Sequence, residues 1–198
     1  MNYLAHAFLS FNNPEILAGN MISDFVKGKK KFNYPLTIQK GIALHRMIDH
    51  FTDFHPVTSI AKNLFRPHYR LYSGAFVDIV YDHFLALDEK QFAVYGGLGS
   101  FSKIVYKELD DQQSFFPPAF ERLFPYMKLQ NWLYEYRLKE NMRKSFSGLV
   151  HRAEYLNESE IAFKTFIEHY NELSECYNAF FPQLKEYAFQ NLPNLLRE

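Results

Sequence analysis

The chain has 198 residues, with 22 basic and 22 acidic side chains and a single cysteine. The balanced charge excludes a protein that binds nucleic acid through a broad basic surface, and one cysteine excludes an internal disulfide and cysteine-rich metal sites. The length predicts one domain over residues 1–198, and an aromatic content of 18% predicts a core filled largely by rings.

Apolar residues recur at steps of three and four along nearly the whole chain, which is helical spacing. Asn13 and Pro14 form a helix start, and Pro35 and Pro56 bound a long helix that carries several histidines. After a short apolar N-terminal helix, the pattern predicts helices over about 14–25, 35–54, 57–65, 71–87, 90–108, 118–128, 130–147 and 158–189. No strand alternation or repeat is evident. The sequence therefore predicts an all-α fold, a single-domain multi-helix bundle.

The first ten residues are mostly apolar, but they carry no basic stretch and end at Asn12, Asn13 and Pro14. A signal peptide needs a basic start, and a membrane span needs about 20 apolar residues. We therefore predict no membrane association and a cytoplasmic protein.

Three short blocks in the first half combine imidazole and carboxylate side chains. The central block is GIALHRMIDHFTDFHP over 41–56, and the flanking blocks are NMISDFVK over 20–27 and DIVYDH over 78–83. A segment that only filled a core would not carry so many side chains able to bind metal. These blocks are the candidate functional site.

Helix geometry predicts which of these side chains face the same way. Residues four apart lie about 40° from each other, so His45 and Asp49 share one face, and Asp78 and Asp82 share another. Helices of a bundle commonly build metal sites from such facing side chains. The candidate metal ligands are His6, Asp24, His45, Asp49, Asp78 and Asp82.

Mostly oxygen ligands with one or two imidazoles favour Mn²⁺ or Mg²⁺, and are also compatible with iron. Several buried carboxylates need a cation or basic partners to stay ionised. Two alternatives remain open: Arg46 is a competing partner for one carboxylate, and His6 can be a hydrogen-bonded core residue.

The order and spacing of four segments resemble the acyl carrier protein phosphodiesterase family. These segments are NYLAH from Asn2, GNMISDFVKG from Gly19, GIALHRMIDHFTDFHP from Gly41 and FVDIVYDHFLA from Phe76. The resemblance implies a helical fold distantly similar to HD-type metal-dependent phosphohydrolases. It also implies hydrolysis of holo-acyl carrier protein to apo-acyl carrier protein and 4′-phosphopantetheine.

An HD-type site has consecutive His and Asp, whereas here His45 precedes Arg46 and the Asp82–His83 pair is inverted. Geometry must therefore assign the ligands, with Asp53, His55 and His83 in reserve. The candidate catalytic residues are Asp24, Asp53 and His55, and either of the last two can protonate the leaving serine oxygen.

Basic residues near the blocks are candidates for docking an acidic carrier protein. They are Lys27, Lys29, Lys30, Lys31, Arg46, Arg66 and Arg70. The resemblance favours electrostatic steering of an acidic helical partner, and a solvated loop is the alternative for the lysines.

Two other features leave choices open. Trp132 and its neighbouring tyrosines predict either core packing or an aromatic wall, and Gly96 and Gly97 predict a turn between helices. The rival functions are an HD-type phosphohydrolase of nucleotides or small phosphoesters and a non-enzymatic helical interaction protein. The sequence leaves the oligomeric state open.

Overall fold

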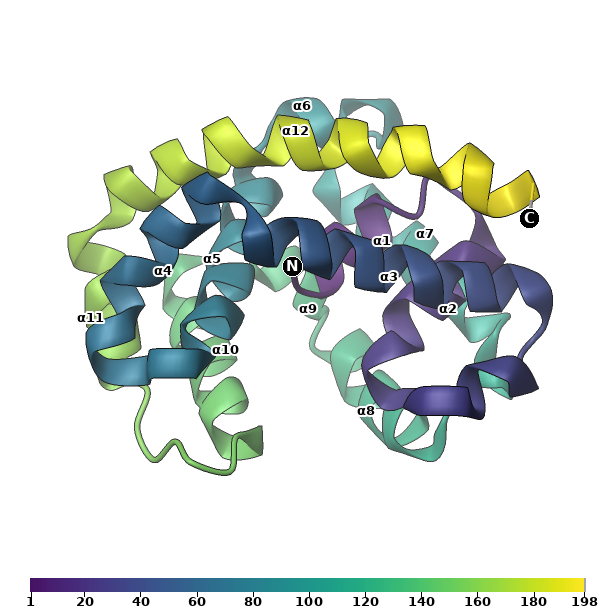
Figure 1. Ribbon diagram of the computed structural model, residues 1–198, viewed down its shortest axis with the longest axis horizontal. Helices are drawn as coiled ribbons and strands as arrows, with labels where there is room; N and C mark the ends of the chain where they lie inside the picture. The colour runs from purple at the N-terminus through teal and green to yellow at the C-terminus, as the bar shows by residue number, and fades with distance from the viewer. Residues whose placement is uncertain (198) are drawn as a thin grey trace.

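A computed structural model describes residues 1–197 and contains helices and no strand over that range, which confirms the all-α prediction. Figure 1 shows the arrangement. The α-helices are α1 (Tyr3–Phe8), α2 (Pro14–Ile22), α3 (Leu36–Phe54), α4 (Pro56–Tyr69), α5 (Ser73–Leu87), α6 (Glu89–Phe92), α7 (Leu98–Asp110), α8 (Pro118–Leu129), α9 (Trp132–Glu135), α10 (Lys139–Arg152), α11 (Glu160–Glu168) and α12 (Tyr170–Arg197). Short 3₁₀ helices are η1 (Ser23–Phe25), η2 (Gly28–Asn33), η3 (Arg70–Tyr72), η4 (Ala93–Tyr95) and η5 (Gln113–Phe115).

Helices α3 and α12 pack against each other and run across the whole molecule (Figure 1). Helices α4, α5, α10 and α11 gather below one half of this pair and form what we call the first arm. Helices α2, α7 and α8 lie below the other half and form the second arm. The short helices α1 and α9 lie between the arms, close to the N-terminus. A continuous cluster of buried apolar side chains joins all these elements.

Three helices are shorter than the periodicity predicts, because the backbone leaves helical geometry inside the expected spans. Gly96 and Gly97 have φ angles of 76° and 102°, so the segment 90–108 divides into α6, η4 and α7. Leu138 is extended and separates α9 from α10. The segment 158–189 divides into α11 and α12 at His169, and α12 then continues through Pro182.

Helices α2 and α3 cross very closely at two glycines. A Cβ atom on Gly19 would lie 2.1 Å from the Ile38 carbonyl oxygen, and one on Gly41 would lie 2.4 Å from the Ile16 carbonyl oxygen. Any larger residue would separate the helices. The contact therefore sets the register that brings Asn20 of α2 next to His45 of α3.

No helix in the described range is long and apolar enough to span a bilayer.

Candidate metal centre

Two histidines and one aspartate from α1 and α3 meet where the arms join. One ligand atom from each of His6, His45 and Asp49 lies within 4.8 Å of the other two. His45 Nε2 is 3.0 Å from Asp49 Oδ2, and His6 Nε2 is 3.2 Å from Asp49 Oδ1. The two imidazole rings stack with centroids 3.9 Å apart. We call these three residues the ligand trio.

Asn20 of α2 fixes the orientation of both imidazoles. His6 Nδ1 donates to the Asn20 side-chain oxygen at 2.8 Å, and His45 Nδ1 donates to the Asn20 backbone carbonyl at 2.7 Å. The Asn20 amide in turn donates to the His6 carbonyl and to Ser10 Oγ. With both Nδ1 atoms engaged as donors, each Nε2 is left to face Asp49. Asn20 was not among the predicted site residues, although its polar side chain inside the apolar run LAGNMI was a usable signal.

The trio has the electronic character of a cation site. A neutral imidazole with a hydrogen on Nδ1 offers only a lone pair at Nε2, and a carboxylate also offers only lone pairs. His6 Nε2 is buried without a hydrogen bond despite its closeness to Asp49, and burial lowers the pKa of His6 to about 4. These facing lone pairs are stabilised only by a positive species between them. A divalent cation fits this requirement, and Asn20 supplies the orienting hydrogen bonds usual around metal-bound histidines.

The pKa values of His45 and Asp49 are shifted in opposite directions, as expected for a paired imidazole and carboxylate. Burial alone would lower the pKa of His45, but hydrogen bonding to Asp24 and Asp49 raises it to about 9. Burial would raise the pKa of Asp49, but the positive groups around it hold it well below its usual range. A proton on His45 thus occupies the place that a metal ion would otherwise take.

Asp24 and Asp78 border the trio on different sides. Asp24 Oδ1 lies 3.1 Å from His45 Nε2, and its side chain is 68% exposed. Its hydrogen bond to His45 holds the pKa of Asp24 below the usual value. Asp78 is 3.0 Å from the Met1 ammonium, which is itself 3.4 Å from Asp49 Oδ1. Asp24 can therefore reach the same ion as the trio, whereas the ammonium separates Asp78 from it.

Asp82 has a different role from the one expected. Its two carboxylate oxygens accept hydrogen bonds from the backbone N–H groups of Asn2, Leu4 and Ala5. It therefore caps the start of α1, where a negative charge also complements the helix dipole. Burial raises the pKa of Asp82 to about 7. Asp82 therefore lies outside the ligand trio, and its assignment as a ligand stays a prediction.

The candidate acids and the reserve ligand lie outside the trio. Asp53 Oδ1 pairs with Lys62 at 2.7 Å, and His55 Nδ1 accepts the Val57 N–H at the start of α4. Their assignment as the acid remains a prediction. His83 Nδ1 donates to the Tyr136 carbonyl at 2.6 Å, which makes His83 a core residue.

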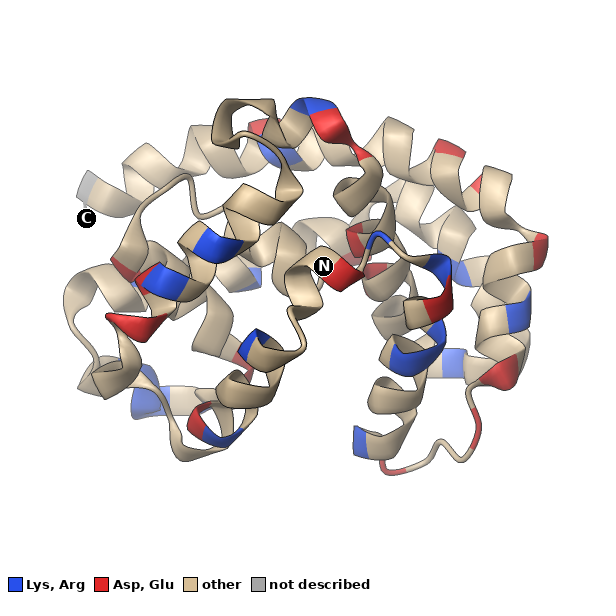
Figure 2. Cartoon of the chain, turned by 180° about the vertical axis from the view of Figure 1, so that it is seen from behind, with Lys and Arg blue, Asp and Glu red and all other residues tan. Residues whose placement is uncertain are grey.

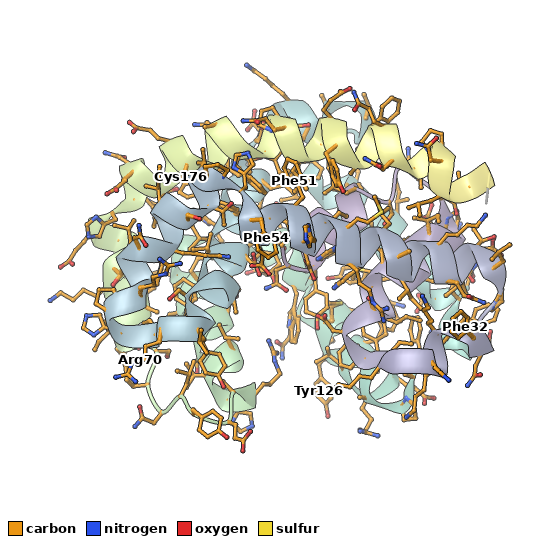
Figure 3. The ribbon with its side chains drawn as sticks, in the orientation of Figure 1. Phe32, Phe51, Phe54, Arg70, Tyr126 and Cys176 are labelled. Carbon is orange, nitrogen blue, oxygen red and sulfur yellow. The ribbon has the colours of Figure 1, made fainter. Side chains whose placement is uncertain are left out.

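The predicted docking residues divide between the two arms. The four lysines lie on and beside η2, which follows Asp24 in the second arm. Arg66 and Arg70 lie on α4 and η3 in the first arm, and Figure 3 shows Arg70 and Phe32 on opposite sides of the molecule. Arg46 donates to the Val26 carbonyl at 3.1 Å, so it is not the carboxylate partner considered above. Figure 2 shows acidic residues beside the N-terminus and basic residues on both arms.

Known proteins similar to the chain cover nearly its full length. The family model for acyl carrier protein phosphodiesterase matches residues 1–184. A protein named acyl carrier protein phosphodiesterase from Photorhabdus laumondii is 29% identical over 95% of this chain and 95% of its own. A protein of that name from Enterobacter sp. strain 638 is 30% identical over 93% of this chain and 95% of its own. Another from Klebsiella pneumoniae is 30% identical over 95% of this chain and 97% of its own.

No solved structure matches the chain, so its predicted likeness to HD-type phosphohydrolases stays a prediction. The family match confirms the resemblance found in the four sequence segments. At the level of the family it also confirms the prediction of a phosphoric diester hydrolase. The chain belongs to the acyl carrier protein phosphodiesterase family.

Proposed function

We propose that the chain hydrolyses the phosphodiester that joins 4′-phosphopantetheine to a serine of acyl carrier protein, and that it uses a divalent cation. The observation that carries the proposal is the ligand trio, in which Asn20 directs two imidazole lone pairs toward Asp49. The names of the relatives supply the substrate class. A cluster of this kind in a member of a phosphodiesterase family is best explained as the reaction centre.

The residues that would hold the ion are His6, His45 and Asp49, with Asp24 beside them. Two imidazoles and two carboxylates suit Mn²⁺, and Mg²⁺ less well because it prefers oxygen ligands alone. A bound divalent cation would polarise a phosphoryl oxygen and lower the pKa of water next to it.

The reaction breaks the bond between phosphorus and the serine oxygen. A water oxygen forms the new bond to phosphorus, one proton leaves the water, and the serine oxygen gains one. Asp24 can accept that proton, because its side chain is exposed and its low pKa keeps it ionised at neutral pH, although the same low pKa makes it a weak base. For the same reason it is a poor acid at neutral pH, so a different group must protonate the serine.

The lysine run extends the proposal to substrate recognition. Lys27, Lys29 and Lys30 are exposed, and no carboxylate within residues 1–197 pairs with any lysine of the run. They follow Asp24 within a few residues, and Asp24 is itself exposed beside the trio. Unpaired exposed lysines would attract an acidic carrier protein and raise its rate of encounter.

The test is release of 4′-phosphopantetheine from purified holo-acyl carrier protein. We expect no release after treatment with a chelator and full recovery with Mn²⁺. Free nucleotides should be hydrolysed poorly. Equal hydrolysis of nucleotides would favour a general phosphohydrolase, and absence of any hydrolysis with metal present would favour an interaction protein.

A further inference from the structure

A cavity lies beside the start of α1, the helix that carries His6, and the proposed reaction leaves it without a role. Its volume is about 230 Å³, and its walls come from the start of α1, from residues around α9 and from α10. Pockets for drug-sized molecules are larger, about 300 to 1,000 Å³. A cavity of this volume holds part of an extended ligand, and the rest of such a ligand must lie outside it.

One wall of the cavity is a single face of α10. The lining residues of α10 recur at steps of three or four, as one helical face requires, with Lys144 and Ser145 adjacent; they are Asn141, Lys144, Ser145, Gly148 and Arg152. Within residues 1–197, no carboxylate pairs with Lys144 or Arg152. This face offers amide, hydroxyl and cationic groups to the space in front of it.

The opposite wall is aromatic. Tyr3, Trp132 and Tyr136 line it, and the rings of Tyr3 and Trp132 are 6.3 Å apart. Trp132 Nε1 donates to Gln130 Oε1 at 2.9 Å, which holds the indole in place. The cavity thus has a largely aromatic wall and a polar wall with two cationic side chains. Glu135 also lines it and accepts a hydrogen bond from the Asn141 amide.

Tyr3 connects this cavity to the ligand trio. It begins α1, and His6 follows on the next turn of the same helix. Tyr3 and Arg152 line the same cavity, so α1 joins the cavity that carries Arg152 to the helix turn that carries His6.

We propose that this cavity binds the 4′-phosphopantetheine arm of the substrate, with Arg152 next to its phosphate. The proposal rests on the proposed function and adds a binding site to it. The arm is a flexible chain of amides and methylenes, which matches one polar wall and one aromatic wall. Its phosphate end must reach the trio, and Arg152 is the cationic residue that shares the cavity with Tyr3, one helix turn before His6. Arg152 binds a phosphate well because its guanidinium forms charge-assisted hydrogen bonds.

The chain carries a built-in reporter for this cavity. Trp132 is its only tryptophan, so intrinsic tryptophan fluorescence reports on the aromatic wall alone. Titration with free 4′-phosphopantetheine, with no metal added, should change Trp132 emission and give a saturable binding curve. Unchanged emission up to millimolar 4′-phosphopantetheine would overturn the proposal.

Gly148 allows the cavity to be filled without damage to the fold. A Cβ atom there would meet only the Arg152 guanidinium, at 4.0 Å. Gly148→Leu therefore places a side chain into the cavity, and leucine is also the better helix former. We expect it to weaken binding of 4′-phosphopantetheine by about tenfold or more. Ser147→Leu adds the same side chain to the exposed face of α10 and should bind like wild type.

Arg152→Met tests whether the phosphate end of 4′-phosphopantetheine lies next to Arg152. It should weaken binding of 4′-phosphopantetheine about tenfold, because one charge-assisted contact is lost. It should leave binding of pantetheine, which lacks the phosphate, unchanged. Equal losses for both ligands would overturn the placement of the phosphate.

The outcome is separable from that of the proposed function. If Gly148→Leu and wild type release 4′-phosphopantetheine from holo-carrier protein with equal KM and kcat, the cavity is not the arm site although the function stands. If 4′-phosphopantetheine binds at Trp132 and no hydrolysis occurs with any divalent cation, the proposed function fails although the binding site stands.

Discussion

Replacement of Asn20 by alanine should uncouple the ligand trio from the helices that hold it. The change removes the acceptor for His6 Nδ1 and two donated hydrogen bonds, to the His6 carbonyl and to Ser10 Oγ. Three buried hydrogen bonds at about 1 kcal/mol each give a loss of roughly 3 kcal/mol in the free energy of unfolding. Without its Nδ1 acceptor, His6 is free to change tautomer and rotate. Loss of such an orienting partner typically lowers metal affinity about 10- to 100-fold.

The assays are urea denaturation and calorimetric titration with Mn²⁺. Asn13→Ala is the matched control, because Asn13 lies at the start of the same helix and caps it by accepting the Ile16 N–H. It should lose about 1 kcal/mol of stability and keep wild-type metal affinity. Asn20→Asp keeps the acceptor for His6 and should bind Mn²⁺ at least as tightly as wild type. If Asn20→Ala folds and binds Mn²⁺ like Asn13→Ala, the orienting role of Asn20 is refuted.

Three further predictions concern the site, the docking surface and the core. His45→Ala should lower turnover of holo-carrier protein by several orders of magnitude with its helical circular dichroism kept, whereas His169→Ala, which removes an exposed partner of Glu172, should keep wild-type turnover. Replacement of four lysines by glutamine should lower kcat/KM for holo-carrier protein and flatten its salt dependence, with kcat unchanged. The four are Lys27, Lys29, Lys30 and Lys31. Parallel salt curves for the variant and wild type would exclude a docking role. His83 has its pKa lowered to about 4 by burial, so its contribution to stability is present above about pH 6.5 and is lost as the pH falls toward 4. Acid should therefore destabilise wild type by roughly 3 kcal/mol more than His83→Gln over that range, measured by urea denaturation at each pH; equal slopes would contradict this.

Helix arithmetic predicts local geometry well, and it predicts long-range partners poorly. His45 and Asp49 are four residues apart and lie 3.0 Å from each other, as their spacing indicates. Asp78 and Asp82 also face one direction, toward the start of α1. Their partners there are the Met1 ammonium and three backbone N–H groups. Because α1 is distant in sequence, spacing within α5 gave no means of distinguishing a cap from a metal ligand.

The contact between α2 and α3 was equally hidden in the sequence. Gly19 and Gly41 are single glycines in two apolar helices, and neither interrupts the helical pattern. Their role becomes clear only when the two helices are seen to cross there, with no space for a Cβ atom. The breaks at Gly96 and Gly97 differ, since adjacent glycines are a recognisable turn signal. The break at Leu138 has no comparable signal, because its neighbours are good helix formers.

The net charge of zero conceals a separation of charge that matters for the proposed reaction. The carboxylates of Asp24, Asp49 and Asp78 lie at the trio. The lysine run lies in the second arm and Lys144 and Arg152 lie on α10 in the first, among the acidic and basic residues that Figure 2 shows on both arms. An acidic carrier protein would be attracted to the arms and repelled by the acidic centre. The 4′-phosphopantetheine group of the carrier protein resolves this conflict. That long group would reach the acidic centre while the body of the carrier protein stays on the basic surfaces. Only the phosphodiester must then approach the carboxylates, and a cation held by the trio would offset that repulsion. Metal binding and carrier-protein docking should therefore be linked: without metal, holo-carrier protein should bind more weakly, whereas apo-carrier protein, which lacks the arm, should bind equally with and without Mn²⁺.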